Sequence, residues 1–451
     1  MPLPEKLSPR WRQAFDWVEA TLGGPVVHAE RQPRWRPAWF LDVLRDGETI
    51  PLYWRGDRGG QAGINRVYTL EHEANVLRVL EANGVPVPHV HGICPEPLGM
   101  LLERVPGRPN LGTAGSQAER EAVQDHFVEL LVRAHAIDPA AFEAEGLVRP
   151  ASAQELALDD LPVWEGNYRK LKSRPEPVIE WVLGWLRRNA PPGRERVTFV
   201  TGDAGQFVFD AGRVTALLDL ELSHLGDPLA DLGALRARDL TEPLGDLRRA
   251  YLRYEELTGE SLDRTALGYH TARFAILTPM AVCHLVTSPP PGLDVIQYLA
   301  WEALFARAAL DAIAEILDEA PAPPALPGPA ETSRSGAHEA LVGMLGRPAN
   351  DGDFAAYQSD TAARLARYLR DVERLAPALD ADELDDLAGV LGERPASLLE
   401  ADAALERFVL DAPAERDPEI LRLLHRRTLR RLALLRSAMR EDPDATIQKL
   451  S

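Results

Sequence analysis

Residues 198–232 read TFVTGDAGQFVFDAGRVTALLDLELSHLGDPLADL and place several carboxylates and one carboxamide at the ends of short apolar runs. Within them, residues 206–218 form two strand-like runs around an Asp-Ala-Gly-Arg segment, whose Asp and Gly suit a tight turn. The pattern predicts a β-hairpin. Because an antiparallel hairpin returns the end of its second strand to the start of its first, we expect Asp219 to lie close to Gln206, with Asp203 on the loop just upstream.

The oxygen-bearing side chains of this hairpin suit phosphoryl transfer. Opposed residues in a hairpin lie roughly 5 Å apart, so one small hard cation such as Mg²⁺ can bridge the oxygens of Gln206 and Asp219. With a phosphate held on that cation, Asp203 can orient a hydroxyl group and accept its proton. We therefore predict Asp203 as the catalytic residue and Gln206 and Asp219 as metal ligands. The alternative is that these side chains only cap turns.

The segment also resembles the catalytic loop of the aminoglycoside phosphotransferase and choline kinase-like family, small-molecule kinases with a protein-kinase-like fold. In that family the loop reads His-Gly-Asp, a short spacer, Asn, an apolar strand, a turn and a second Asp, with Gly-Asp-Pro further on. The residues that stand in those places here are Thr201, Gly202, Asp203, Gln206, Asp219, Gly226, Asp227 and Pro228. The resemblance extends over about residues 25–320. It implies ATP-dependent phosphorylation of a hydroxyl group on a small molecule.

The chain departs from the family pattern in its catalytic loop. Thr201 replaces the His, and the spacer after Asp203 is shorter, so that Gln206 stands where Asn is expected. Gln is one methylene longer than Asn and can reach a metal from a displaced backbone position with the same carbonyl oxygen. Further along, we predict that Asp227 and Asp231 brace the loop, Asp231 as a helix cap.

The first lobe is expected to hold the nucleotide phosphates. Residues 38–54 read as a hairpin with Asp-Gly at the turn. The resemblance makes its second strand the one that ends in a phosphate-binding Lys. The chain has no Lys between Lys6 and Lys170, so none lies there. Arg55 is the nearest cation at the matching place, and a guanidinium can bind phosphate as a bidentate fork.

The loop at residues 31–37 precedes this hairpin and is not rich in glycine. Its backbone therefore cannot lie over phosphates as freely as a flexible glycine loop. Arg34 and Arg36 can compensate with positive charge. Ordinary surface arginines are the alternative.

Other residues of the first lobe complete the expected nucleotide site. An amphipathic helix over residues 68–83 carries Glu73 at the place of the family's helix glutamate. The resemblance therefore predicts an ion pair between Glu73 and Arg55, with an ordinary exposed Glu as the alternative. It also implies that backbone groups around Glu103 to Val105 meet the adenine edge at the hinge.

Beyond the hinge the sequence predicts helices and a linker. Ser116 followed by Glu119 is a capping-box pattern at the start of a core helix, at whose end we expect His135 to be buried and hydrogen-bonded. Residues 320–337 are rich in proline and predict an extended linker. A cationic cluster at residues 425–436 is expected to form a solvated helix face, with docking of an acidic partner or of the kinase lobe as the alternative.

Composition limits the class of protein and its partners. The chain has 451 residues, 45% of them hydrophobic and 26% charged, which predicts two or three domains with substantial cores. Its net charge of −19 argues against a nucleic-acid binder. Cys94 and Cys283 lack metal-ligand spacing. No signal peptide or membrane-spanning run is evident, so we expect a cytoplasmic protein without a membrane partner.

We therefore expect an α+β class with a bilobal protein-kinase-like fold and an added C-terminal all-α domain. The expected segments are an N-lobe with an N-terminal helix at residues 1–107, a C-lobe with the catalytic loop at residues 108–319, a linker at residues 320–337 and a helical accessory domain at residues 338–451. Self-association or protein docking through the accessory domain is a further expectation.

The predicted function is an ATP-dependent phosphotransferase that uses Mg²⁺ and acts on a hydroxyl group of a small molecule. Relatives with the Gly-Asp-Pro-Leu-Ala-Asp pattern look like phosphotransferases found with acyl-CoA metabolism, so a hydroxyacyl compound competes with an aminosugar as acceptor. The alternative is a degenerate kinase that binds a nucleotide, or nothing, and acts as a scaffold. The missing Lys, the loop without glycine and Thr201 favour that alternative, whereas Asp203 and Asp219 disfavour it.

Overall fold

The computed structural model describes residues 7–32, 36–57, 68–346 and 353–450. Contacts divide the chain into two compact units. Unit 1 consists of residues 1–159, 195–231 and 242–262, and unit 2 of residues 160–194, 232–241 and 263–451. The predicted catalytic, metal and nucleotide-binding residues all belong to unit 1.

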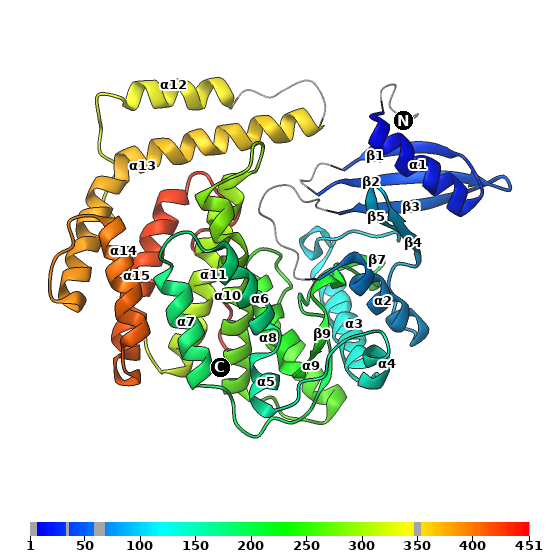
Figure 1. Ribbon diagram of the computed structural model, residues 1–451, viewed down its shortest axis with the longest axis horizontal. Helices are drawn as coiled ribbons and strands as arrows, with labels where there is room; N and C mark the ends of the chain where they lie inside the picture. Colours follow the sequence, from blue (N-terminus) through cyan, green and yellow to red (C-terminus); the bar gives the residue numbers. More distant parts are fainter. Residues whose placement is uncertain (1–6, 33–35, 58–67, 347–352, 451) are drawn as a thin grey trace. The chain divides into compact units, whose positions relative to one another are not determined.

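A five-stranded antiparallel sheet forms the β-rich part of unit 1 (Figure 1). Its strands, in the spatial order β1-β2-β3-β5-β4, are β1 Val26–Arg31, β2 Ala38–Arg45, β3 Glu48–Gly56, β5 Leu98–Glu103 and β4 Val90–Pro95. The predicted hairpin is confirmed, since β2 pairs with β3 and the turn residues Asp46 and Gly47 have positive φ angles of 52° and 82°. Turns with two positive φ angles match the twist of the strands that they join, which is why Asp-Gly suits this position.

Two helices of unit 1 pack against this sheet: α1 (Pro9–Leu22) and α2 (Leu70–Ala82). Phe15 and Val18 of α1 share one apolar cluster with Trp39 and Trp54 of the sheet. The side chain of Thr69 caps α2 by accepting a hydrogen bond from the His72 N–H. The apolar stripe that the sequence predicts for α2 is buried, and it orients the helix on the sheet.

The remainder of unit 1 surrounds the predicted catalytic segment. Its elements are η1 Leu111–Thr113, α3 Gln117–His135, α4 Pro139–Glu143, α5 Ala153–Leu158, β6 Thr198–Val200, β7 Phe207–Asp210, β8 Arg213–Leu217, η2 Leu220–Leu222, β9 His224–Gly226 and α9 Leu247–Thr258. β6 pairs with β9 and β7 with β8, both antiparallel. Ser116 caps α3 through the Glu119 N–H, which confirms the predicted helix start. Helix α8 (Pro228–Arg238) begins in unit 1 and ends in unit 2.

Within its described residues, unit 2 consists of helices and their connections. They are α6 Leu161–Leu171, α7 Pro177–Arg188, α10 Arg264–Thr287, α11 Val295–Ile316, α12 Ser335–Leu345, α13 Asp353–Leu391, α14 Leu398–Asp411, η3 Ala414–Arg416 and α15 Asp417–Leu435. α10 packs along α11, α14 against α7, and α15 against α11 and α13. The helices after the predicted linker therefore share a compact unit with α7, α10 and α11.

The cationic cluster on α15 is buried in part rather than solvated. Arg427 and Arg430 each have 2% exposure. Arg427 forms ion pairs with Glu383 and Asp402, and Arg430 forms one with Asp386. The predicted solvated face is wrong for these two arginines, because α13 and α14 bring acidic residues opposite them.

The α+β class predicted from the sequence is confirmed by the antiparallel sheet of unit 1 and the helices of unit 2. Among the described residues, no helix combines the length and the apolar character needed to cross a bilayer.

Candidate active site

The hairpin of β7 and β8 brings the predicted metal ligands together. Phe207 pairs with Leu217, and the Leu218 N–H donates a hydrogen bond to the Gln206 carbonyl oxygen at 2.9 Å. Gln206 and Asp219 are therefore neighbours at the open end of the hairpin, as predicted. Both residues are partly exposed, so their side-chain oxygens are accessible to a ligand.

Arg55 lies near the end of β3 and contacts three carboxylates. Its Nε is 2.9 Å from Glu73 Oε2, which confirms the predicted ion pair. One of its terminal nitrogens pairs with Asp219 and lies 3.1 Å from Glu221 Oε2. The Arg55 side chain is 7% exposed and that of Glu73 is 3% exposed, so their ion pair is buried, whereas the Asp219 side chain is 37% exposed. Asp219 adopts φ 56° and ψ 48°, a left-handed conformation that Asp tolerates better than most residues.

Burial and mutual charge change the protonation of this network. Burial alone would lower the pKa of Arg55, but the carboxylates of Asp219, Glu73 and Glu221 outweigh it and raise the pKa well above the usual value. Burial raises the pKa of Glu73 to about 7, against the opposing effect of Arg55. Arg55 therefore stays cationic at neutral pH, whereas burial disfavours the charged form of Glu73 and the charge of Arg55 favours it.

Glu221 is a site residue that the sequence analysis missed. It lies in η2, two positions after Asp219, and its Oε2 lies 2.6 Å from a terminal nitrogen of Arg36. Glu221 thus joins Arg36 of the loop before β2 to Arg55 of β3. In the sequence, Glu221 is visible only as an acidic residue two positions after Asp219. An ordinary surface Glu would look the same, so the sequence alone does not mark it as a site residue. Arg34, predicted beside Arg36, lies outside the described residues.

The loop that carries Asp203 is held by a buried carboxylate. Asp231 Oδ2 accepts a hydrogen bond from the Thr201 N–H at 2.9 Å, and its Oδ1 accepts from the Thr201 hydroxyl at 2.7 Å and from the Gly202 N–H at 3.1 Å. His135 Nε2 lies 3.0 Å from Oδ2, and its Nδ1 lies 2.9 Å from the Tyr254 hydroxyl. Asp231 therefore braces the loop, as predicted, although it does so from inside α8 rather than as a cap. His135 is buried and hydrogen-bonded, also as predicted.

Gly202 is required by the shape of this loop. Its φ is 80°, and a Cβ at this position would lie 2.1 Å from the Leu222 carbonyl oxygen. The loop before Asp203 thus passes directly against η2, the element that carries Glu221. Asp203 itself is partly buried between this Gly and the start of β7.

The side chains at this site suit a hard divalent cation and a phosphate. Asp219 and Gln206 offer a carboxylate and a carboxamide oxygen, which are preferred ligands of Mg²⁺. Arg55 supplies a guanidinium group next to Asp219, and Arg36 supplies one next to Glu221. The donor set therefore fits a metal-bound phosphate.

Comparison with known sequences identifies a segment that contains Gln206, Asp219 and Glu73, whereas Arg36 and Arg55 precede it. Residues 64–274 match the model of the phosphotransferase enzyme family. This segment belongs to that family. The chain is also similar to acyl-CoA dehydrogenase family member 10 of Mus musculus, 31% identical over 178 residues that cover 37% of this chain and 16% of the relative. It is similar to acyl-CoA dehydrogenase family member 11 of Rattus norvegicus as well. That match is 29% identical over 222 residues, which cover 44% of this chain and 28% of the relative. The chain spans less than a third of the length of these relatives.

Two solved structures whose backbone is similar to that of this chain are phosphotransferases. One is a thermostable mutant of an aminoglycoside phosphotransferase in a ternary complex with ADP and hygromycin B, at 16% identity and a TM-score of 0.49, covering 66% of this chain and 98% of that one. Another is the macrolide 2'-phosphotransferase MphH from Brachybacterium faecium, at 18% identity and a TM-score of 0.45, covering 65% and 97%.

The hinge predicted for the phosphotransferase segment follows β5. The Glu103 N–H donates to the His89 carbonyl and the Arg104 N–H to the Pro51 carbonyl, at 2.9 and 3.1 Å. These two N–H groups are therefore engaged by sheet neighbours. Val105 comes after the end of the strand and is partly exposed. The adenine-binding role of Glu103 and Val105 stays a prediction.

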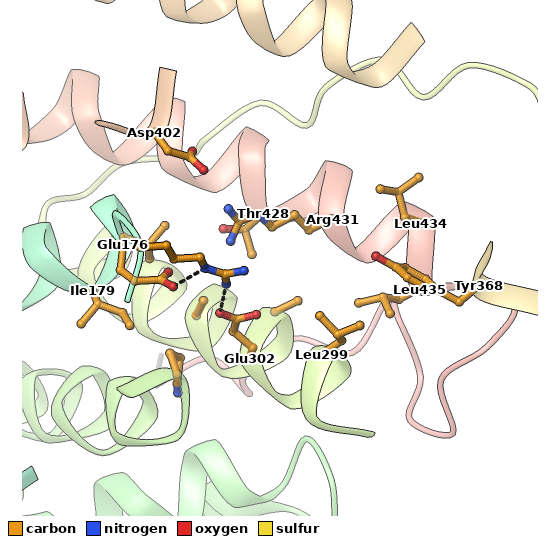
Figure 2. A pocket seen from close by; sticks show the side chains of 15 residues that line it. Glu176, Ile179, Leu299, Glu302, Tyr368, Asp402, Thr428, Arg431, Leu434 and Leu435 are labelled. Carbon is orange, nitrogen blue, oxygen red and sulfur yellow. Dashed lines mark hydrogen bonds and ion pairs between the residues drawn. The ribbon is translucent and has the colours of Figure 1, made fainter. Parts of the chain in front are cut away.

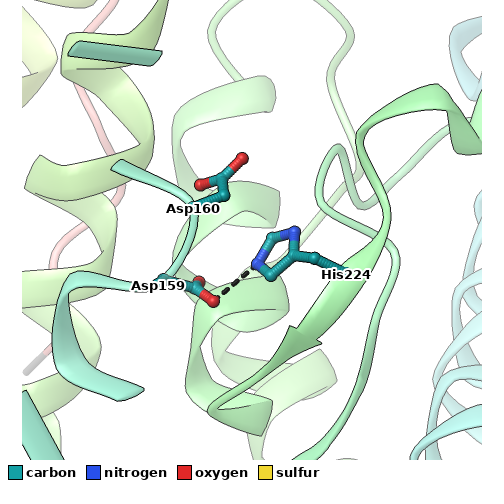
Figure 3. A group of neighbouring side chains, drawn as sticks. All are labelled: Asp159, Asp160 and His224. Carbon is teal, nitrogen blue, oxygen red and sulfur yellow. Dashed lines mark ion pairs between the residues drawn. The ribbon is translucent and has the colours of Figure 1, made fainter. Parts of the chain in front are cut away.

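A second buried pair of side chains lies at β9, just after the segment that carries Asp219 and Glu221. His224 Nε2 lies 2.6 Å from Asp159 Oδ1, and Figure 3 shows the two side chains facing each other. His224 Nδ1 lies 2.8 Å from the Leu222 carbonyl oxygen. Both ring nitrogens thus face oxygens, and the contact fixes β9 just after η2.

We expect Arg55→Gln to lower the free energy of unfolding by about 3–5 kcal/mol, because it leaves Glu73 buried without its cation. Adding Glu73→Gln should recover a large part of that loss, since the lone carboxylate is then removed. Urea unfolding of the single and double variants measures the coupling. Arg104→Gln is the control, because the ion pair of Arg104 with Asp42 is more exposed and should contribute about 1 kcal/mol or less. An Arg55→Gln variant as stable as the control would contradict the role of Arg55.

We expect Asp231→Asn to lower the free energy of unfolding by roughly 2–3 kcal/mol, because Asn keeps one acceptor oxygen and turns an amide group toward existing donors. Amide hydrogen exchange at Thr201 and Gly202 should become faster. Asp246→Asn is the control: Asp246 caps α9, and Asn caps a helix equally well. Unchanged exchange at the loop would show that Asp231 does not hold it.

Proposed function

We propose that this protein transfers the γ-phosphoryl group of ATP to a hydroxyl group of a small molecule. The observation that carries the proposal is the buried Arg55, which joins Glu73 of α2 to Asp219 at the end of the hairpin. A buried cation placed between a helix glutamate and a metal-ligand carboxylate is the arrangement that phosphoryl transfer needs for its phosphates. The family of residues 64–274 supports the same reaction class.

The proposed roles follow from the chemistry of each side chain. Gln206 and Asp219 hold Mg²⁺, which when bound neutralises phosphate charge. Arg55 binds the phosphates and is oriented by Glu73. Asp203 orients the acceptor hydroxyl and receives its proton. The hinge at Glu103 and Val105 receives the adenine edge.

The charge balance of the site supports binding of a metal together with a nucleotide. Glu73, Asp219 and Glu221 surround Arg55, and Arg36 contacts only Glu221 among them. The carboxylates thus outnumber the arginines, so a divalent cation offsets their excess charge. A phosphate then takes the guanidinium donors that the carboxylates release. We infer that the nucleotide binds as its Mg²⁺ complex and weakly without the metal.

The acceptor is proposed at the level of a class. Hygromycin B in the aminoglycoside phosphotransferase complex is an aminosugar-bearing compound, whereas the sequence relatives bear acyl-CoA dehydrogenase names. The hydroxyl group of the acceptor is the part of the proposal that follows from the resemblance of the catalytic segment, and these names only suggest compounds to try. A screen should therefore contain aminoglycosides and hydroxyacyl compounds.

The alternative proposal is a degenerate kinase that retains a nucleotide site without turnover. Two observations favour it. Arg55 replaces the Lys of the family, and its guanidinium is already bonded to Asp219. Thr201 stands where the family has His, and its hydroxyl is bonded to Asp231. A binding measurement and a turnover measurement separate the two proposals.

We expect isothermal titration to detect ATP binding that requires Mg²⁺, and Asp219→Asn to weaken it by about tenfold or more, because a metal ligand loses its charge. Asp210→Asn is the matched control, since Asp210 is an exposed residue of the same hairpin. Asp203→Asn should retain binding and lower turnover by about 10²–10⁴-fold, as expected for a general base.

The outcomes of this experiment separate the proposals. Metal-dependent binding with turnover in the acceptor screen supports the kinase. Binding with no turnover on any hydroxyl compound favours the degenerate kinase. No binding of ATP to the wild type, with or without Mg²⁺, would rule out the ATP site and leave a scaffold.

A further inference from the structure

Unit 2 contains a cavity of about 210 Å³ with no part in the proposed reaction. It lies among α7, α10, α11, α13, α14 and α15, so all of its walls belong to one compact unit. Most of the lining side chains are aliphatic, including Ile179, Leu299 and Leu435. Figure 2 shows Glu176 from just before α7, Glu302 of α11 and Arg431 of α15 around the same space. The cavity is therefore apolar with a small group of charges.

Most charged side chains that line this cavity have direct partners. Arg174 pairs with Glu176 at 2.6 Å and with Glu302 at 3.0 Å. Asp402 pairs with Arg427 of α15. Of the charged side chains that line the cavity, Arg174 and the three acidic residues Glu176, Glu302 and Asp402 therefore each have an ion-pair partner.

Arg431 is the exception. It lies on α15 and lines the cavity, and its partly exposed side chain has no hydrogen bond or ion pair within the part of the chain that the structure describes. Burial would lower the pKa of Arg431, but the carboxylates of Glu302, Asp402, Glu176 and Glu383 raise it. Arg431 therefore stays cationic, with its hydrogen-bond donors available to a ligand.

We propose that this cavity binds a small aliphatic monocarboxylate, whose carboxylate pairs with Arg431 and whose apolar chain lies against Leu299 and Leu435. A guanidinium matches a carboxylate as a planar fork with two parallel hydrogen bonds. The aliphatic walls match a hydrocarbon chain. A phosphate fits less well, because its second negative charge would face Glu176, Glu302 and Asp402.

Glu302 couples this binding to pH. Burial raises its pKa to about 7, Arg431 opposes that effect, and Glu176 adds to it. The other groups that face it from neighbouring elements are Arg174 before α7, Cys283 of α10, Tyr368 of α13 and Asp402 of α14. A bound carboxylate favours the neutral form of Glu302. Binding therefore takes up a proton, and affinity falls as pH rises through 7.

The test uses hexanoate as probe, titrated into the full-length protein at pH 6 and at pH 8. We expect hexanoate to bind, with affinity about tenfold lower at pH 8. Hexanol and hexylamine, which keep the chain but change the charge, should bind more weakly than hexanoate. Titration in buffers of different ionisation enthalpy should reveal proton uptake at pH 7.

Single substitutions test whether hexanoate binding depends on Arg431 and whether its pH dependence comes from Glu302. Arg431→Gln should lower hexanoate affinity at least tenfold, and Arg431→Lys should lower it less, because Lys keeps the charge but not the fork. Arg422→Gln is the matched control, since Arg422 lies exposed on the same helix and pairs with Glu319. Glu302→Gln should retain binding and remove its pH dependence.

Several results would overturn the proposal. They are no hexanoate binding at pH 6, equal or tighter binding of hexanol or hexylamine, or undiminished binding by both Arg431 variants. If Arg431→Gln does not fold, Arg431→Lys and Glu302→Gln still decide the question, because each conserves size and polarity at its position. The residues of this cavity belong to unit 2 and those of the proposed phosphate site to unit 1, so loss of one binding activity does not imply loss of the other.

Discussion

The charge of Arg55, buried among three carboxylates, is the interaction on which the candidate site depends. Its Nε faces Glu73 and a terminal nitrogen faces Asp219 and Glu221, so one side chain links α2, β3 and the segment after the hairpin. A Lys has one point charge and no fixed fork, so it would not hold these groups in the same geometry. Arg55 therefore supplies the geometry of this site as well as its positive charge.

The parts of the fold and site that could be predicted are those with local signals. The Asp46-Gly47 turn fixed the register of the first hairpin, and Ser116 with Glu119 marked the start of α3. The second hairpin followed from an Asp and a Gly between two apolar runs, and its antiparallel pairing brought Gln206 beside Asp219. In each case the determining residues are close in sequence, so their physical effect does not depend on how distant elements pack.

The parts that could not be predicted depend on distant partners. Arg36 contacts Glu221, which lies 185 positions away in the sequence, and neither residue carries a sequence pattern that distinguishes it from surface charge. On α15, Arg427 and Arg430 look like a solvated face until α13 and α14 supply Glu383, Asp386 and Asp402. Helical periodicity assigns polar residues to solvent, and it fails where two helices pack through ion pairs.

Buried charge has different consequences in the two units. In unit 1, Arg55 and Arg36 are both engaged by carboxylates, so the proposed phosphate ligand would have to replace contacts that already exist, and the proposed divalent cation would take the carboxylates. In unit 2, Arg174 is engaged in the same way, but Arg431 keeps its charge through carboxylates that act on it without bonding to it. A partly buried guanidinium in that condition has lost some hydration without gaining a hydrogen-bond partner, which is a state that a bound anion relieves. The same residue type therefore organises a closed network in one unit and leaves an open binding position in the other.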